Sequence, residues 1–178
     1  MFIQRSLLLG LMLPALLLSA CRKDEPEIDF GPDGGFQYRT RQNIPGPGDA
    51  TDWTADGPWN SKEKGLFSSL NLSLDEAQQS RTWYSSVYPN PSEAADGFTF
   101  MTSVSSNNPA PAGSRKAYVI VDRRYNVLQR GDINATTHED VVFGPNSLPA
   151  GSLYRLYYVC YVPGQRVYFR SHGDIKVE

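Results

Sequence analysis

The feature that most limits the fold is a series of short segments, from about residue 80 onward, in which apolar and polar residues alternate. A period of two places alternate side chains on the two faces of a β-strand. Turn-forming pairs such as Pro163-Gly164 separate these segments. We therefore predict strands at 82–88, 97–105, 116–122, 126–130, 139–143, 153–162, 165–170 and 174–177.

Strands this short, separated by Gly, Pro and Asn, are typical of an antiparallel sandwich. Ten Tyr, eight Phe and three Trp provide enough apolar surface for a core. We predict an all-β, Ig-like antiparallel β-sandwich over residues 57–178. A short helix near 60–69 is expected before it, because Asn60 can cap a helix and Glu63 follows three residues later, as a capping box requires.

Residues 1–20 have the composition of a secretory signal peptide. Arg5 precedes a short apolar run, and small residues close the segment. The ending Leu18-Ser19-Ala20-Cys21 resembles the lipobox of bacterial lipoproteins. This resemblance implies cleavage before Cys21 and a lipid on its thiol, so that the membrane is a partner through that lipid. An ordinary secreted protein is the alternative.

Residues 21–56 are rich in Gly, Pro and Asp, and we predict that they form a flexible tether with one edge strand at most. Within them, Lys23, Asp24 and Glu25 resemble the surface-export signal of lipoproteins in bacteria that use type IX secretion. A solvated stretch of tether explains the same three residues equally well. The expected location is the cell envelope, at the outer membrane, with surface exposure if the export interpretation holds.

The second half, residues 87–178, carries a series of motifs in a fixed order. These are Tyr88-Pro89-Asn90-Pro91, Val119-Ile120-Val121-Asp122, Leu148-Pro149-Ala150-Gly151-Ser152-Leu153-Tyr154 and Ile175-Lys176-Val177. Together they resemble the C-terminal sorting domain of type IX secretion cargo, which implies an Ig-like fold. A lipobox is unusual for such cargo, and fold does not imply function. The resemblance therefore supports the fold more than a role in secretion.

Several classes of function are disfavoured by the residues present. The formal net charge of −2, with no basic block, argues against nucleic acid as a partner. Cys160 lies in an apolar segment, where a buried structural thiol is expected. His138 and His172 are expected at the surface, and the aspartates at 49, 52 and 56 in a solvated loop. We predict no catalytic residues, no metal site and no cofactor.

The expected function is therefore that of a non-enzymatic envelope lipoprotein, whose sandwich is a binding or structural module for an envelope protein. The alternative is a glycan-binding surface lipoprotein. Aromatic side chains can form a stacking platform for sugars, although in a small sandwich they more often belong to the core. The candidate platform comprises Trp53, Trp59, Trp83 and Tyr84.

Overall fold

The protein is an all-β antiparallel sandwich, as predicted, in a computed structural model that describes residues 27–32, 34–78, 83–104, 109–135, 140–165 and 167–178. Within these residues no helix is long and apolar enough to cross a membrane. The strands are β1 (Gln37–Arg39), β2 (Pro45–Gly48), β3 (Trp83–Tyr88), β4 (Phe98–Val104), β5 (Arg115–Val121), β6 (Val127–Asn134), β7 (Asp140–Phe143), β8 (Ser152–Tyr161) and β9 (Val167–Val177).

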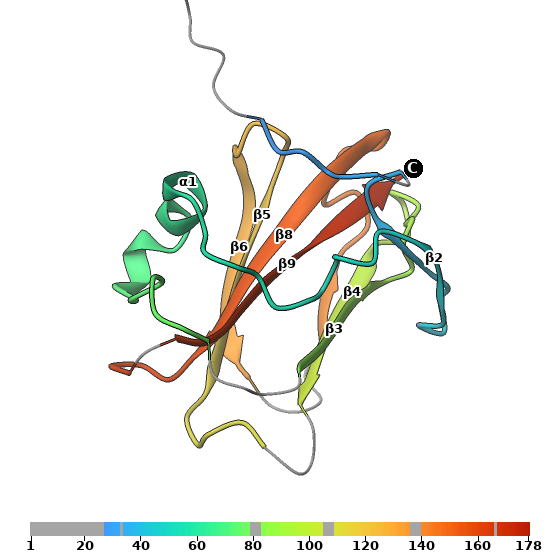
Figure 1. Cartoon of the computed structure of the whole chain (residues 1–178). Helices are drawn as coiled ribbons and strands as arrows, with labels where there is room; N and C mark the ends of the chain where they lie inside the picture. Colours follow the sequence, from blue (N-terminus) through green and yellow to red (C-terminus); the bar gives the residue numbers. More distant parts are fainter. Residues whose placement is uncertain (1–26, 33, 79–82, 105–108, 136–139, 166) are drawn as a thin grey trace, which may run out of the picture.

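Two sheets pack face to face, one with the order β3-β4-β7 and the other with the order β6-β5-β8-β9 (Figure 1). Along each strand, successive side chains point alternately to the inner and the outer face, as the period of two predicts. The Phe100 ring of β4 lies 5.3 Å from that of Tyr158 on β8, and both are fully buried. Burial of a large apolar side chain contributes about 1.5–3 kcal/mol, so this aromatic layer is a main source of stability.

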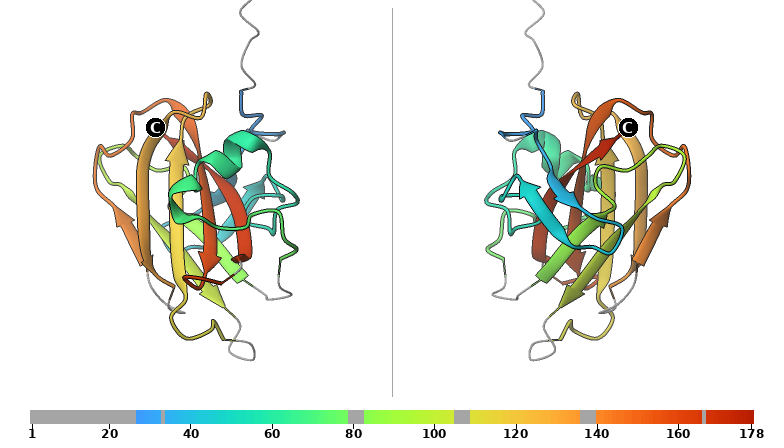
Figure 2. Two further views of the ribbon diagram at one scale, coloured as in Figure 1. Left: turned by 90° about the vertical axis from the view of Figure 1, so that its left-hand side faces the viewer. Right: turned by 90° about the vertical axis from the view of Figure 1, so that its right-hand side faces the viewer.

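A helical segment covers the outer face of the four-stranded sheet (Figure 2). It contains α1 (Ser61–Gly65) and the 3-10 helix η1 (Ser68–Leu70), where a short helix was predicted. The Asn60 side chain accepts the backbone N–H of Glu63, and the Glu63 carboxylate accepts that of Asn60, which confirms the capping box. The Trp59 ring stacks on Phe67 and meets Tyr157 of β8 edge-on, each at 5.5 Å.

The expected flexible tether over residues 21–56 differs from the structure from Ile28 onward. Ile28, Phe30 and Trp53 are buried, and β1 and β2 form a hairpin beside β3 (Figure 2). The Gly and Pro residues do supply turns, but three apolar side chains between those turns attach the segment to the sandwich. The folded part therefore begins close to Ile28, and not near residue 57.

The two last predicted strands, at 165–170 and 174–177, are one continuous strand, β9, and the predicted break at Gly173 is wrong. A Cβ atom at Gly173 would lie 2.2 Å from the indole ring of Trp53. Glycine is thus required by a ring that packs on the strand, and the chain does not turn there.

The Tyr88-Pro89-Asn90-Pro91 motif joins three segments through the side chain of Asn90, which is fully buried. Its amide nitrogen donates to the carbonyl oxygens of Gln37 (3.1 Å) and Asp174 (2.9 Å). Its amide oxygen accepts the backbone N–H of Lys176 at 2.9 Å. The Asn90 side chain therefore joins β1 and β9 to the segment that directly follows β3.

Candidate functional site

A cavity of about 590 Å³ opens at the seam between the two sheets, where the edge strands β3 and β9 approach each other. We call it the seam pocket. The segment 50–55 and β1 form its remaining walls. Its lining residues are Gln37, Arg39, Ala50, Asp52, Trp53, Thr54, Ala55, Tyr84, Ser85, Ser86, Met101 and Phe169.

The segment 52–56 is held in this wall because it lies along β9, joined to it by backbone hydrogen bonds and an isolated bridge between Ala55 and Ser171. The backbone N–H of Trp53 donates to the carbonyl of His172 at 2.8 Å, and that of Asp56 donates to Arg170 at 3.2 Å. Trp53 has a φ of 64°, which is a strained conformation for a bulky residue. The strain is maintained by packing, since the indole ring covers Gly173 and lies 6.0 Å from the Phe100 ring.

Two buried polar atoms on lining residues have no hydrogen-bond partner among the described residues. They are the indole Nε1 of Trp53 and the Oγ of Ser86. Leaving such a group unpaired in the interior costs about 1–3 kcal/mol. Most buried polar groups in folded proteins are paired, so these two atoms are exceptions in the wall behind the seam pocket.

Asp52 places a carboxylate in the same wall although its side chain is only 4% exposed. Its oxygens accept the backbone N–H groups of Gln37 (2.8 Å) and Asp174 (3.0 Å). Burial, together with the charge of Asp174, raises the pKa of Asp52 to about 7. The carboxyl group is therefore poised to gain or lose a proton near neutral pH.

Two further ion pairs lie behind Asp52 on the outer side of β9. Arg155 holds both carboxylate oxygens of Asp174 at 2.6 Å, in the two-point geometry that suits a guanidinium group. His172 lies 2.8 Å from Asp56. Burial opposes protonation of His172, but the hydrogen bond and charge of Asp56 outweigh it and raise the pKa.

The aspartates and His172 thus lie elsewhere than the sequence suggested. Asp49 and Asp52 are buried instead of solvated, because the loop that carries them packs on β9. His172 lies inside a strand and is paired, not exposed in a turn. His138 is outside the described residues.

The structure divides the four candidate platform residues between separate places. Trp53 and Tyr84 both line the seam pocket, Trp53 buried and Tyr84 59% exposed. Trp59 is buried on the outer face of the other sheet, where its Nε1 donates to Asp56 at 2.6 Å. The side chain of Trp83 lies outside the described part, as do Cys21, Lys23, Asp24 and Glu25.

Cys160 lies on the inner face of β8 and is fully buried, as the sequence predicted. Burial raises the pKa of its thiol, which keeps the sulfur protonated and unreactive. In the described ranges, no group of three His, Cys, Asp or Glu residues is arranged to hold a metal ion.

The pairing of Asp52 with Asp174 was missed by sequence reasoning, since no spacing in one chain reveals a contact across 122 positions. The residues at the seam therefore form a polar and aromatic cleft with one titratable carboxyl group.

No protein-family model matches this chain, and no curated protein matches it in sequence.

Proposed function

We propose that this chain is a lipoprotein of the cell envelope, held on a membrane by lipid on Cys21, with its β-sandwich acting as a binding module. The observation that carries the proposal is the sequence Leu18-Ser19-Ala20-Cys21 directly after a basic and apolar leader. Two or three acyl chains hold a protein firmly, since each buried methylene contributes about 0.8 kcal/mol.

The position of Ile28, the first buried residue among those described, limits the distance between the anchor and the sandwich. Ile28 is buried, and its backbone N–H donates to Arg123 at 2.8 Å. An extended chain spans at most about 3.6 Å per residue, so the seven steps from Cys21 to Ile28 cover at most about 25 Å. If Cys21 carries the lipid, Ile28 therefore lies within about 25 Å of the anchor.

We expect a Cys21→Ser variant to accumulate as uncleaved precursor and to lose all labelling by a palmitate analogue. A serine hydroxyl cannot form the thioether, and cleavage depends on the lipid. The measurement is metabolic labelling of the full chain followed by gel analysis. Cys160→Ser is the matched control, because it removes the other thiol. Labelling that survives in Cys21→Ser would contradict the proposal.

The seam pocket supports a second candidate function, the binding of glycans at the cell surface. The exposed Tyr84 ring offers a stacking face, and Gln37, Arg39 and Thr54 line the same cavity with polar side chains. Trp59 takes no part in this candidate site.

For this second function we expect a Tyr84→Ala variant to bind its glycan at least about fivefold more weakly, since stacking on an aromatic ring contributes about 1–3 kcal/mol. Its stability should change little, because the side chain is exposed. Glycan-array binding with wild type first identifies the sugar, and titration of each variant follows. Tyr38→Ala is the control, as Tyr38 is also exposed but does not line the pocket. Equal losses in both variants, or no glycan bound by wild type, would exclude this function.

A further inference from the structure

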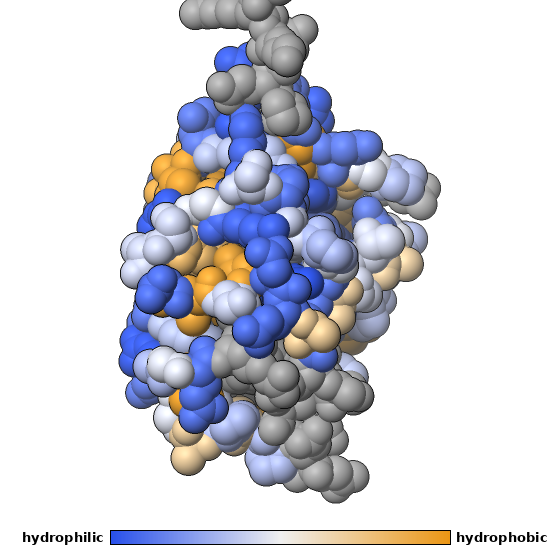
Figure 3. Space-filling view, turned by 60° about the vertical axis from the view of Figure 1, so that its left-hand side comes forward, coloured by the Kyte–Doolittle hydropathy of each residue, from blue (hydrophilic) through white to orange (hydrophobic). Residues whose placement is uncertain are grey.

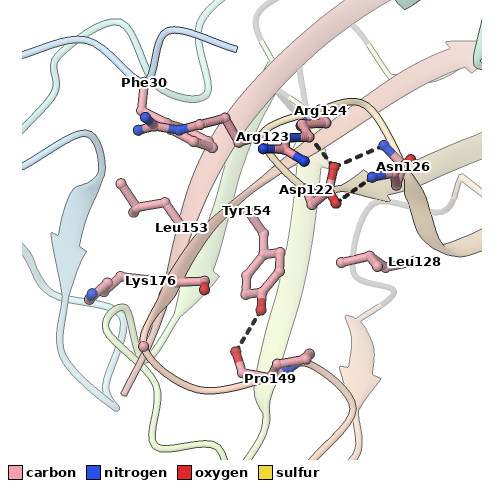
Figure 4. A pocket seen from close by; sticks show the side chains of 12 residues that line it. Phe30, Asp122, Arg123, Arg124, Asn126, Leu128, Pro149, Leu153, Tyr154 and Lys176 are labelled. Atoms are coloured by element: carbon pink, nitrogen blue, oxygen red, sulfur yellow. Dashed lines mark hydrogen bonds between the residues drawn. The ribbon is translucent and has the colours of Figure 1, made fainter. Parts of the chain in front are cut away.

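A second cavity, of about 640 Å³, lies at the end of the sandwich where the chain enters the fold (Figure 4). We call it the end pocket. The β5–β6 turn and the loop before β8 form opposite sides of it, and Phe30 covers one edge. Its lining residues are Phe30, Asp122, Arg123, Arg124, Asn126, Leu128, Pro149, Gly151, Ser152, Leu153, Tyr154 and Lys176.

Hydrogen bonds fix two walls of this pocket. Asp122 accepts the backbone N–H groups of Arg124 (2.8 Å) and Asn126 (2.9 Å) and so fixes the β5–β6 turn. Across the pocket, the Tyr154 hydroxyl donates to the carbonyl of Pro149 at 2.6 Å (Figure 4). This bond resembles the tyrosine corner of Ig-like sandwiches and holds the loop before β8.

Three cations contribute to the lining, and only one carboxylate does. The Asp122 carboxylate oxygens accept hydrogen bonds within the turn, and Arg124 forms an ion pair with Glu27 at 3.3 Å. The Arg123 guanidinium group lies 5.3 Å from the centroid of the Phe30 ring. In the part of the chain that the structure describes, neither Arg123 nor Lys176 forms an ion pair.

The position of the end pocket relative to the anchor indicates what it meets. Residues 27–30, the β5–β6 turn and the end of β9 all lie at one end of the molecule (Figure 1). Ile28 is bonded to Arg123 there, seven residues after Cys21. If Cys21 is lipidated as proposed, Ile28 lies within about 25 Å of the anchor, and the cations beside it are within reach of the headgroups.

We propose that the end pocket binds the phosphate group of an anionic lipid in the leaflet that holds the anchor. Arginine presents paired N–H donors that match phosphate oxygens, and Lys176 is a further cation in the lining of the pocket. Leu128 is 44% exposed and lines the pocket, which places an apolar side chain beside the phosphate site. The contact would fix the orientation of the sandwich, whereas the acyl chains alone allow it to rotate.

The face that carries α1 differs from this end in character. This face combines polar side chains with apolar patches (Figure 3), whereas the end pocket combines cations with Leu128.

The test uses the mature chain from residue 21 with Cys21→Ser, which retains every described residue but carries no lipid. We expect it to cosediment with vesicles of phosphatidylcholine containing 30 mol% phosphatidylglycerol, and not with phosphatidylcholine alone. An added Arg123→Ala and Lys176→Ala pair should weaken this binding about 30-fold, since each cation near an anionic surface contributes about 1 kcal/mol. Raising the salt concentration should weaken it too.

The matched control is the pair Arg41→Ala and Arg115→Ala, which removes the same net charge from exposed ion pairs outside the pocket. A comparable loss in the control would overturn the proposal, as would equal binding to both kinds of vesicle. Binding of inorganic phosphate at the pocket without any preference for anionic vesicles would assign it to a soluble phosphate and also overturn it. Circular dichroism confirms that each variant is folded. Because these chains lack the lipid, failure here is separate from failure of palmitate labelling.

Discussion

Replacement of Arg155 by alanine is expected to lower the free energy of unfolding by about 3–5 kcal/mol, the range typical for removing one partner of a buried ion pair. The Arg155 and Asp174 side chains are 11% and 1% exposed, and two hydrogen bonds of 2.6 Å join them. Without the guanidinium group, the Asp174 carboxylate remains buried with no cation beside it. Urea denaturation followed by tryptophan fluorescence measures the loss.

The matched control for Arg155 is Arg115→Ala on β5. Arg115 also forms an ion pair with an aspartate, Asp132, but both side chains are 34% exposed. Water and salt screen an exposed pair, so this variant should lose much less stability than Arg155→Ala. If the two variants are equally destabilised, burial of the Arg155–Asp174 pair is not the cause.

We also expect the protein to be less stable at pH 8 than at pH 5, by on the order of 2–4 kcal/mol, since one pKa unit corresponds to about 1.4 kcal/mol. The pKa of Asp52 is about 7 in the folded chain, because of burial and the charge of Asp174, against an ordinary value of 3.8. The folded state thus holds the proton more tightly, and its advantage is lost as the pH rises from about 4 to 7. His172 acts in the same direction, since its raised pKa favours the folded state below the ordinary value of 6.5 and this is lost on deprotonation.

The measurement is chemical denaturation of wild type at pH 5, 6, 7 and 8. An Asp52→Asn variant removes the titrating group, so its stability should vary much less over this range. His172 and Asp174 face Asp52 and remain in the variant, which leaves a smaller residual slope. A wild type that gains stability from pH 5 to 8 would contradict the assignment to these groups.

The strands could be predicted because their alternation is local, and the errors have a common physical cause. β6 continues to Asn134, although the predicted strand ended at residue 130. Gly131 lies opposite Tyr118, whose ring would lie 2.3 Å from a Cβ atom there. At Gly131, as at Gly173, an aromatic ring from a distant segment requires the glycine. A sequence pattern cannot distinguish this requirement from a turn.

The candidate site was only partly predictable. The predicted aromatic platform included Trp53 and Tyr84, and the structure brings both to one cavity. The same signal included Trp59, which belongs to the packing under α1. The polar components, Asp52 with Asp174 and Ser86, depend on pairing between segments far apart in the chain, for which no local pattern exists.

The pairing of residues 52–56 with β9 has a consequence for when the molecule can fold. Trp53, Asp52 and Asn90 all complete their bonds on the strand that follows every other described element in the chain. During synthesis, residues 52–56 have no strand to pair with until β9 emerges. A nonsense mutation near codon 167 would therefore remove these bonds, and the expected product is an unfolded polypeptide and not a shortened domain.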